Sequence, residues 1–137
     1  MKIVSEDRKS FIEIVFIESE KERMPSIKVS VSIQNEAFAG ALNSTWIEID
    51  ELNKFLLNMD EIDIKRSGKA HLCSMSPCEF ILDFETFDKL GHIKVVYSIT
   101  KLISYPFFRE LSLNGGFDIG LSEFSNIVKS FRKLISE

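Results

Sequence analysis

The segment from Phe38 to Met59 constrains the fold most, because a strand pattern leads into a helix pattern with almost no linker between them. In its first half, large apolar residues lie on one side of an extended chain, with small residues between them: Phe38, Leu42 and Trp46. In its second half, apolar residues recur at the spacing of one helix face: Leu52, Phe55, Leu56 and Met59. We predict a helix from about Glu51 to Asp60, capped by Asp50. A sheet face and a helix stripe joined this closely must bury each other.

Three strand patterns cluster in the first third of the chain. An apolar run from Lys9 to Glu18 predicts a strand covered on both faces. After a polar connection at Pro25, strict alternation predicts a strand with one buried face, formed by Ile27, Val29, Val31 and Ile33. The chain then turns, and Ala37 to Ile47 runs back antiparallel to this strand. Successive strands with short connections indicate a meander.

More strand patterns follow the first helix. Lys69 to Met75 is short, and Cys78 to Phe84 alternates with Phe80, Leu82 and Phe84 on the inner side. His92 to Thr100 places four residues inward: Ile93, Val95, Tyr97 and Ile99. A last strand is expected from Phe108 to Leu113, with Gly115 and Gly116 forming a bulge or tight bend after it.

The C-terminal segment predicts a second amphipathic helix. Ser122 is the expected cap, and one apolar stripe follows it: Phe124, Ile127, Val128, Phe131, Leu134 and Ile135. The element order predicts a single α+β domain over residues 1–137. Its main part is an antiparallel sheet of six to eight strands, arranged as a meander or sandwich. One helix is inserted in mid-chain, and the C-terminal helix packs on the sheet.

Length and charge narrow the classes of function. The 137 residues suffice to bury a core without metals or disulfides. The net charge of −4 argues against nucleic acid as a direct partner, because phosphate binding needs a surplus of Lys and Arg on one face. Charges interrupt the amino-terminal residues before any apolar run of export-signal length, and no segment is apolar enough to cross a membrane. We therefore expect a cytoplasmic protein with no membrane partner.

Cys73 and Cys78 are the only cysteines, and His71 and His92 are the only histidines. The cysteines could form a disulfide or half of a metal site, or they could be small apolar side chains on two strands of a hairpin. A zinc site needs four ligands, and these four residues have no familiar ligand spacing. The sequence favours the second interpretation, so we expect no metal and no cofactor.

Other residues with reactive side chains have ordinary structural interpretations as well. His92 could act as a general base, but a solvent-facing residue at the start of a strand fits the pattern better, and His71 is similar. Asp83, Glu85 and Asp88 could bind a cation, yet a strand displays such residues in a row and does not wrap an ion. Trp46 could stack on a ligand, although we expect it in the core. No nucleophile with a base and no paired acids are recognisable, so we expect no catalytic residues and no enzyme.

Several motifs, in their order along the chain, resemble the WapI-type immunity proteins of bacterial polymorphic toxin systems. The resemblance covers most of the chain from about Phe11 onward and is carried by four segments: FAGALNSTWIEIDELNKFLLNM, GKAHLCSM, LGHIKVVYSI and LSEFSNIVKSFRKLI. The stretch from Lys101 to Gly120 departs from the family pattern, with SYPFF and NGGFDIG where a plainer strand is expected. Strand pairing in that stretch is left open.

This resemblance implies an intracellular protein that binds a cognate toxin domain and neutralises it by occlusion. It carries over no catalytic residue and no contact residue. If the toxin is basic, an outward row formed by Glu79, Asp83 and Glu85 is a candidate contact, because a cationic partner would relieve the repulsion within the row. The alternative for these three residues is a charged face that keeps the protein soluble. The alternative for the whole chain is a non-enzymatic domain that binds a small ligand or serves as a scaffold.

Overall fold

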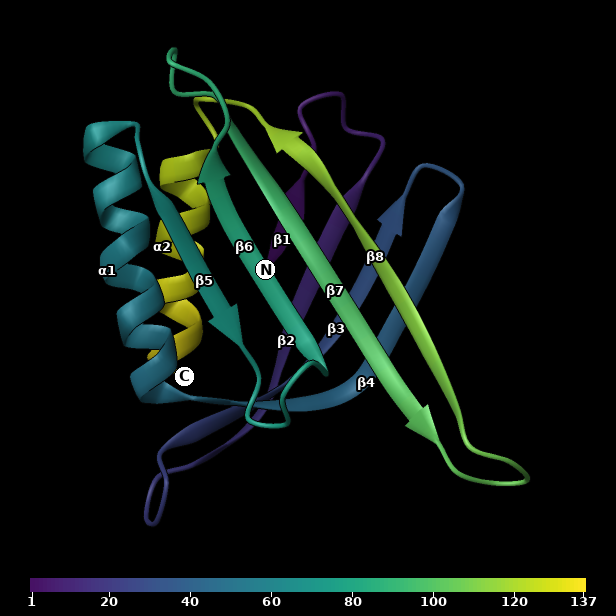
Figure 1. The fold of residues 1–137 in the computed structure, drawn as a ribbon. Helices are drawn as coiled ribbons and strands as arrows, with labels where there is room; N and C mark the ends of the chain where they lie inside the picture. The colour runs from purple at the N-terminus through teal and green to yellow at the C-terminus, as the bar shows by residue number, and fades with distance from the viewer.

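The computed structural model describes residues 1–137 as two antiparallel four-stranded sheets and two helices (Figure 1). The first sheet has the order β1-β2-β3-β4, with bounds Lys2–Val4, Phe11–Glu20, Ser26–Asn35 and Phe38–Glu48. The second has the order β5-β6-β7-β8, with bounds Lys69–Cys73, Phe80–Thr86, Ile93–Ile103 and Arg109–Ile119. Helix α1 (Ile49–Lys65) connects the sheets, and α2 (Phe124–Ile135) ends the chain. The predicted α+β class is confirmed, and the eight antiparallel strands lie within the predicted range of six to eight.

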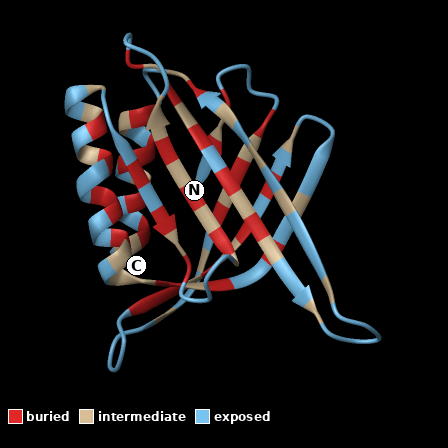
Figure 2. Cartoon of the chain, in the orientation of Figure 1, coloured by how far each residue is buried: buried red, intermediate tan, exposed pale blue.

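One contiguous apolar core joins both sheets and both helices. The alternation predicted from the sequence is confirmed in three strands, where every second residue is buried (Figure 2). These inward residues are Ile27, Val29, Val31 and Ile33 of β3, Phe80, Leu82 and Phe84 of β6, and Ile93, Val95, Tyr97 and Ile99 of β7. Alternate burial follows from the pleat, which directs successive side chains to opposite faces.

The two helices stand side by side next to β5 (Figure 1). Their buried stripes meet at a group of aromatic rings, in which Phe55 of α1 lies 5.0 Å from Phe131 of α2, measured between ring centroids. Phe84 of β6 contacts both rings, at 6.1 and 6.4 Å. Arg132 of α2 also forms an ion pair with Asp60 of α1, which raises the pKa of the Arg132 guanidinium. The helices are therefore held to each other and to the β5–β6 side of the second sheet.

Trp46 is not in the core, contrary to our prediction. Val31 pairs with Leu42 but Val29 pairs with Thr45, so β4 contains an extra residue between these pairs. Such a bulge exchanges the two faces of the strand, because side chains alternate with a period of two. Leu42 and Thr45 therefore both face inward, whereas Trp46 faces outward and lies half-buried beside the Lys28 ammonium.

Phe38, which was predicted on the same apolar side as Leu42 and Trp46, is also exposed. It is the first residue of β4, next to the turn from β3. Strand β2 is covered on one face only, and not on both as predicted. Ile12 and Ile14 are fully buried, but Val15 and Ile17 are more than two-fifths exposed. The apolar run was misleading because the first sheet packs a single face against the core.

The helix caps also differ from the prediction. Helix α1 begins at Ile49, two residues before the predicted start, and Asp50 lies in its first turn instead of capping it. It continues to Lys65 and ends at Arg66, whose backbone is left-handed. Helix α2 begins at Phe124, so Ser122 belongs to the preceding turn, and neither helix has a side-chain cap. Neither is long and apolar enough to cross a lipid bilayer.

Gly115 and Gly116 lie inside β8 and do not form the predicted bulge, because the pairing of β7 with β8 is regular from Arg109 to Ile119. A Cβ atom at Gly115 would lie 2.5 Å from the Tyr97 hydroxyl, and one at Gly116 would lie 2.6 Å from the Val95 carbonyl oxygen. The Tyr97 hydroxyl accepts a hydrogen bond of 2.8 Å from Asn35 Nδ2 of β3. The glycines leave room for this polar link between the sheets.

We predict that Phe55→Ala lowers the free energy of unfolding by about 3–5 kcal/mol, the range for removing a buried Phe ring. Phe55 is 1% exposed and contacts aromatic rings of β6 and α2. Leu57→Ala on the same helix is the control, because Leu57 is 67% exposed and its loss should change stability by less than about 0.5 kcal/mol. Urea denaturation measures both variants, and a loss under about 1 kcal/mol for Phe55→Ala would contradict this packing.

Gly115→Ala should lower the free energy of unfolding by about 1–3 kcal/mol, because the new methyl group overlaps the Tyr97 hydroxyl and displaces it from Asn35. Gly120→Ala is the matched control, since the nearest atom to its new Cβ is 3.7 Å away. Thermal and urea unfolding of both variants should separate them clearly. Equal stability of the two variants would mean that the Tyr97 side chain moves aside without loss.

Candidate functional site

The candidate contact row lies on the outer face of the second sheet. Asp83 and Glu85 project from β6 on the side opposite its buried residues, and Glu79 lies in the turn before the strand. Ile81 separates Glu79 from the other two, and all three acidic residues are half-buried. The prediction of a shared face agrees with the burial pattern of β6 for Asp83 and Glu85, whereas Glu79 lies outside the strand. Whether they contact a partner stays a prediction.

Two of the carboxylates of this row have partners on adjacent strands. Asp83 is paired with His71 of β5, whose Nδ1 lies 2.5 Å from Asp83 Oδ1. Glu85 is paired with Lys94 of β7 at 3.1 Å. The sequence does not reveal these pairs, since they depend on the register between strands. Glu79 forms no ion pair, so it is the one carboxylate of the row that is free to bind a cation.

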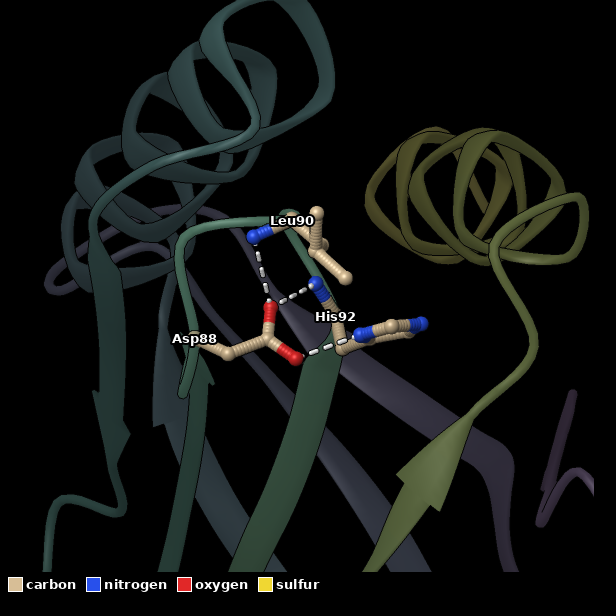
Figure 3. A network of polar contacts seen from close by, with 3 residues as sticks. All are labelled: Asp88, Leu90 and His92. Atoms are coloured by element: carbon tan, nitrogen blue, oxygen red, sulfur yellow. Dashed lines mark hydrogen bonds and ion pairs between the residues drawn. The ribbon is translucent and has the colours of Figure 1, made fainter.

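His92 is held by the turn that precedes β7 (Figure 3). Asp88 Oδ1 accepts hydrogen bonds from the backbone N–H groups of Leu90 and His92, at 2.9 and 3.1 Å. Asp88 Oδ2 accepts a third from His92 Nδ1, at 2.5 Å. These bonds, with that from the His92 ring the largest contribution, lower the pKa of the Asp88 carboxyl. The ring of His92 also stacks on Phe87 at 6.0 Å between centroids. The contacts of His92 are therefore those of a structural residue in a tight turn.

The candidate cation site is not assembled. Asp83 bonds to His71, Glu85 pairs with Lys94, and Asp88 is engaged in its own turn. No three His, Cys, Asp or Glu side chains lie close enough together to hold a metal ion.

Both cysteines are free thiols in this structure. Cys73 lies at the end of β5 and is half-buried, as expected for a strand residue. Cys78 is exposed in the turn before β6, where its φ of 68° places it in the left-handed region. The interpretation that both lie on strands is therefore wrong for Cys78, because the turn that begins at Ser76 and Pro77 extends to Glu79.

The hairpin formed by β7 and β8 projects from the rest of the molecule, and its end is largely exposed (Figures 1 and 2). At least half of the surface of each of five large residues is exposed at its tip: Leu102, Tyr105, Phe107, Phe108 and Leu111. We call these five residues the apolar tip. Residue patterning did not identify it as a site. The available signal was the SYPFF segment, in which Pro106 interrupts the strand pattern.

A groove separates the projecting hairpin from β4. It consists of two adjoining cavities of about 480 and 320 Å³ that share Leu42, Thr100 and Lys101. The smaller cavity lies between small residues of β4 and apolar residues of the hairpin, including Ala39, Gly40, Ala41, Ile99, Leu111 and Leu113. The larger cavity is polar, and its lining includes Glu79 and Glu110. One of the three candidate contact residues therefore lies in this groove.

The apolar tip and the groove together form the candidate functional site. Large apolar side chains that gather exposed at one end of a molecule are a common feature of protein-binding surfaces. No family model matches the chain, and neither a curated protein nor a solved structure matches it significantly.

The turn around Asp88 gives a pH-dependent prediction. Because the pKa of Asp88 is lowered below 3.8 in the folded protein, its ionised form stabilises the fold. This contribution is present above the unfolded-state pKa and is lost as the pH falls through the lower folded-state value. The difference in unfolding free energy between wild type and Asp88→Asn should be constant above about pH 5 and shrink below pH 3.8.

Urea denaturation between neutral pH and about pH 3 tests this dependence. Lys89→Gln is the control, because it alters the same turn without removing a carboxylate. Its difference from wild type should not change below pH 3.8. A difference for Asp88→Asn that stays constant over the whole range would contradict the assignment.

Proposed function

We propose that this chain is an intracellular immunity protein that binds a toxin domain and neutralises it by occlusion. The observation that carries the proposal is the apolar tip on the projecting hairpin. The resemblance of the sequence to WapI-type immunity proteins supplies the specific form of the function, and the structure supports the more general part, protein binding.

The apolar tip favours a protein partner on energetic grounds. Exposed apolar surface is unfavourable in water by about 25 cal/mol for each Å², so a cluster of five large side chains stabilises a complex that buries it. Aromatic residues are also enriched among the residues that contribute most to protein–protein affinity, and three of the five are aromatic: Tyr105, Phe107 and Phe108. The tip therefore has the chemistry of an interface centre.

The acidic row fits a role at the edge of such an interface. Charges at the rim of a complex act mainly on the rate of association, through steering of an oppositely charged partner. The net charge of −4 has the sign that attracts a basic toxin. Occlusion requires only that the bound protein covers the surface on which the toxin acts, so this function needs no catalytic group.

A small-ligand or scaffold domain is the second candidate. The observation that favours it is the larger cavity, because its volume of about 480 Å³ falls in the range of ligand sites. Most of its lining residues are polar or charged, and Leu102 is the one residue of the apolar tip among them, which favours the protein-binding function. A metabolite that raised the melting temperature of the purified protein would support the ligand-binding candidate.

Co-expression tests the immunity function directly. The toxin domain is taken as the variable carboxy-terminal domain of the protein encoded immediately upstream. Its expression alone should arrest growth, and co-expression with this protein should restore growth and yield a complex on size-exclusion chromatography. Continued growth arrest without a complex would reject the immunity function.

Reversal of the row, by Glu79→Lys, Asp83→Lys and Glu85→Lys together, should slow association with the toxin domain. Because rim charges act through steering, most of the salt dependence of the association rate should disappear as well. Glu22→Lys, Asp50→Lys and Glu61→Lys together form the control, since these exposed residues lie elsewhere and give the same change in net charge. Stopped-flow association at two ionic strengths, with circular dichroism to check folding, distinguishes the variants. Identical kinetics in both would exclude the row as a contact.

A further inference from the structure

Strand β8 is a free edge of the second sheet, because it pairs with β7 alone. In an antiparallel pair, the N–H and C=O groups of alternate residues point to the same side of the strand. The carbonyl oxygen of Asp118 accepts a bond from the Glu6 N–H, and that of Gly116 accepts one from Asn35 Nδ2, both at 3.1 Å. The even-numbered residues of β8 therefore direct their main-chain polar groups away from β7.

These two bonds cover only the end of the edge that lies against the first sheet. Three even-numbered residues closer to the apolar tip, Glu110, Ser112 and Asn114, are exposed, and no residue of the first sheet bonds to their main chain. Their N–H and C=O groups form a short row open to a further strand.

Apart from the charge of Glu110 at its end, the open part of this edge lacks the features that usually prevent edge-to-edge pairing. Proteins protect such edges with Lys, Pro, inward-pointing charges or bulges. From Leu111 to Phe117, β8 contains no charged residue and no proline, and its pairing with β7 has no register shift. An edge kept open and regular in this way is suited to accept a strand.

The side chains beside this edge indicate what the added strand would carry. Leu111 and Leu113 alternate with the open residues and line the groove, where Gly40 of β4 is closely packed against Leu113. Apolar side chains at alternate positions of an added strand would cover Leu111 and Leu113. At the other end, Glu79, Lys101 and Glu110 are among the residues that line the larger cavity, and none of these three residues forms an ion pair. This charge arrangement complements one basic side chain.

We infer that the partner contributes an extended strand that pairs with the open edge of β8. Its inward side chains are apolar at alternate positions, and a Lys or Arg at one end enters the cavity beside Glu79 and Glu110. The inference rests on the proposed function and makes the toxin domain the source of the strand. A second copy of this chain, with its own net charge of −4, would not supply the same complement. Main-chain bonds give affinity in this mode of binding, and side-chain pockets give specificity.

Ser112→Pro is the decisive variant, because proline removes the outward N–H at the centre of the open edge. That N–H faces away from β7, so the substitution breaks no bond within the sheet. Binding to the toxin domain encoded immediately upstream should weaken by about tenfold or more, since one strand bond is lost and its acceptor is left unpaired. Ser112→Ala, which removes the hydroxyl but keeps the N–H, is the matched control and should bind as wild type does. Calorimetry measures the affinities.

Amide hydrogen exchange on the wild-type protein tests the inference without any variant. The amides of Glu110, Ser112 and Asn114 should exchange rapidly in the free protein and become protected in the complex. A complex that leaves them unprotected, together with unchanged affinity of Ser112→Pro, would overturn strand addition and leave the immunity function standing. Absence of any complex with wild type would overturn the function and the inference with it. A wild-type dimer that Ser112→Pro converts to monomer in sedimentation would show that a second copy, and not the toxin, occupies the edge.

Discussion

The packing around Phe84 determines how the inner face of the second sheet is divided. This ring contacts Phe55 of α1 and both Phe124 and Phe131 of α2, so the helices are fixed over the β5–β6 side of the sheet. The first sheet covers the β7–β8 side, where Asn35 bonds to Tyr97 and Gly40 packs against Leu113 and Ile99. The helices thus pack on one half of the sheet and the first sheet packs on the other half. Neither reaches the far end of the β7–β8 hairpin.

The candidate site is exposed because the strands of the second sheet differ in length. Strands β7 and β8 have eleven residues each, whereas β5 has five and β6 has seven. Leu111 lies on the inner side of the hairpin and is 54% exposed, although residues of β4 line the same groove. Packing of the core at one end therefore leaves an apolar surface and an open strand edge at the other. A protein-binding function uses both of these features.

Those parts of the fold that depend on local patterning could be predicted from the sequence. The period-two alternation of β3, β6 and β7 and the apolar stripes of both helices identified residues that are buried in the structure. The errors arise where pairing with a neighbouring strand decides the outcome. Trp46 faces outward because of a bulge against β3, and Asp83 bonds to His71 because the two residues lie opposite each other in the register of β5 and β6. A single sequence does not encode register in a readable form.

The largest error concerns the residues that form the candidate site, and it has a physical reason. Gly115 and Gly116 suggested a break in the strand, since glycine weakens an isolated strand, yet here they accommodate Tyr97 and Val95 of the neighbouring strand. Phe107 and Phe108 would be expected in a core on hydrophobicity alone, but both are exposed. Under the proposed function, these residues satisfy the complex and not the free chain, so local rules fail there first. The segment from Lys101 to Gly120, where patterning was weakest, is for this reason the segment in which a binding surface is most expected.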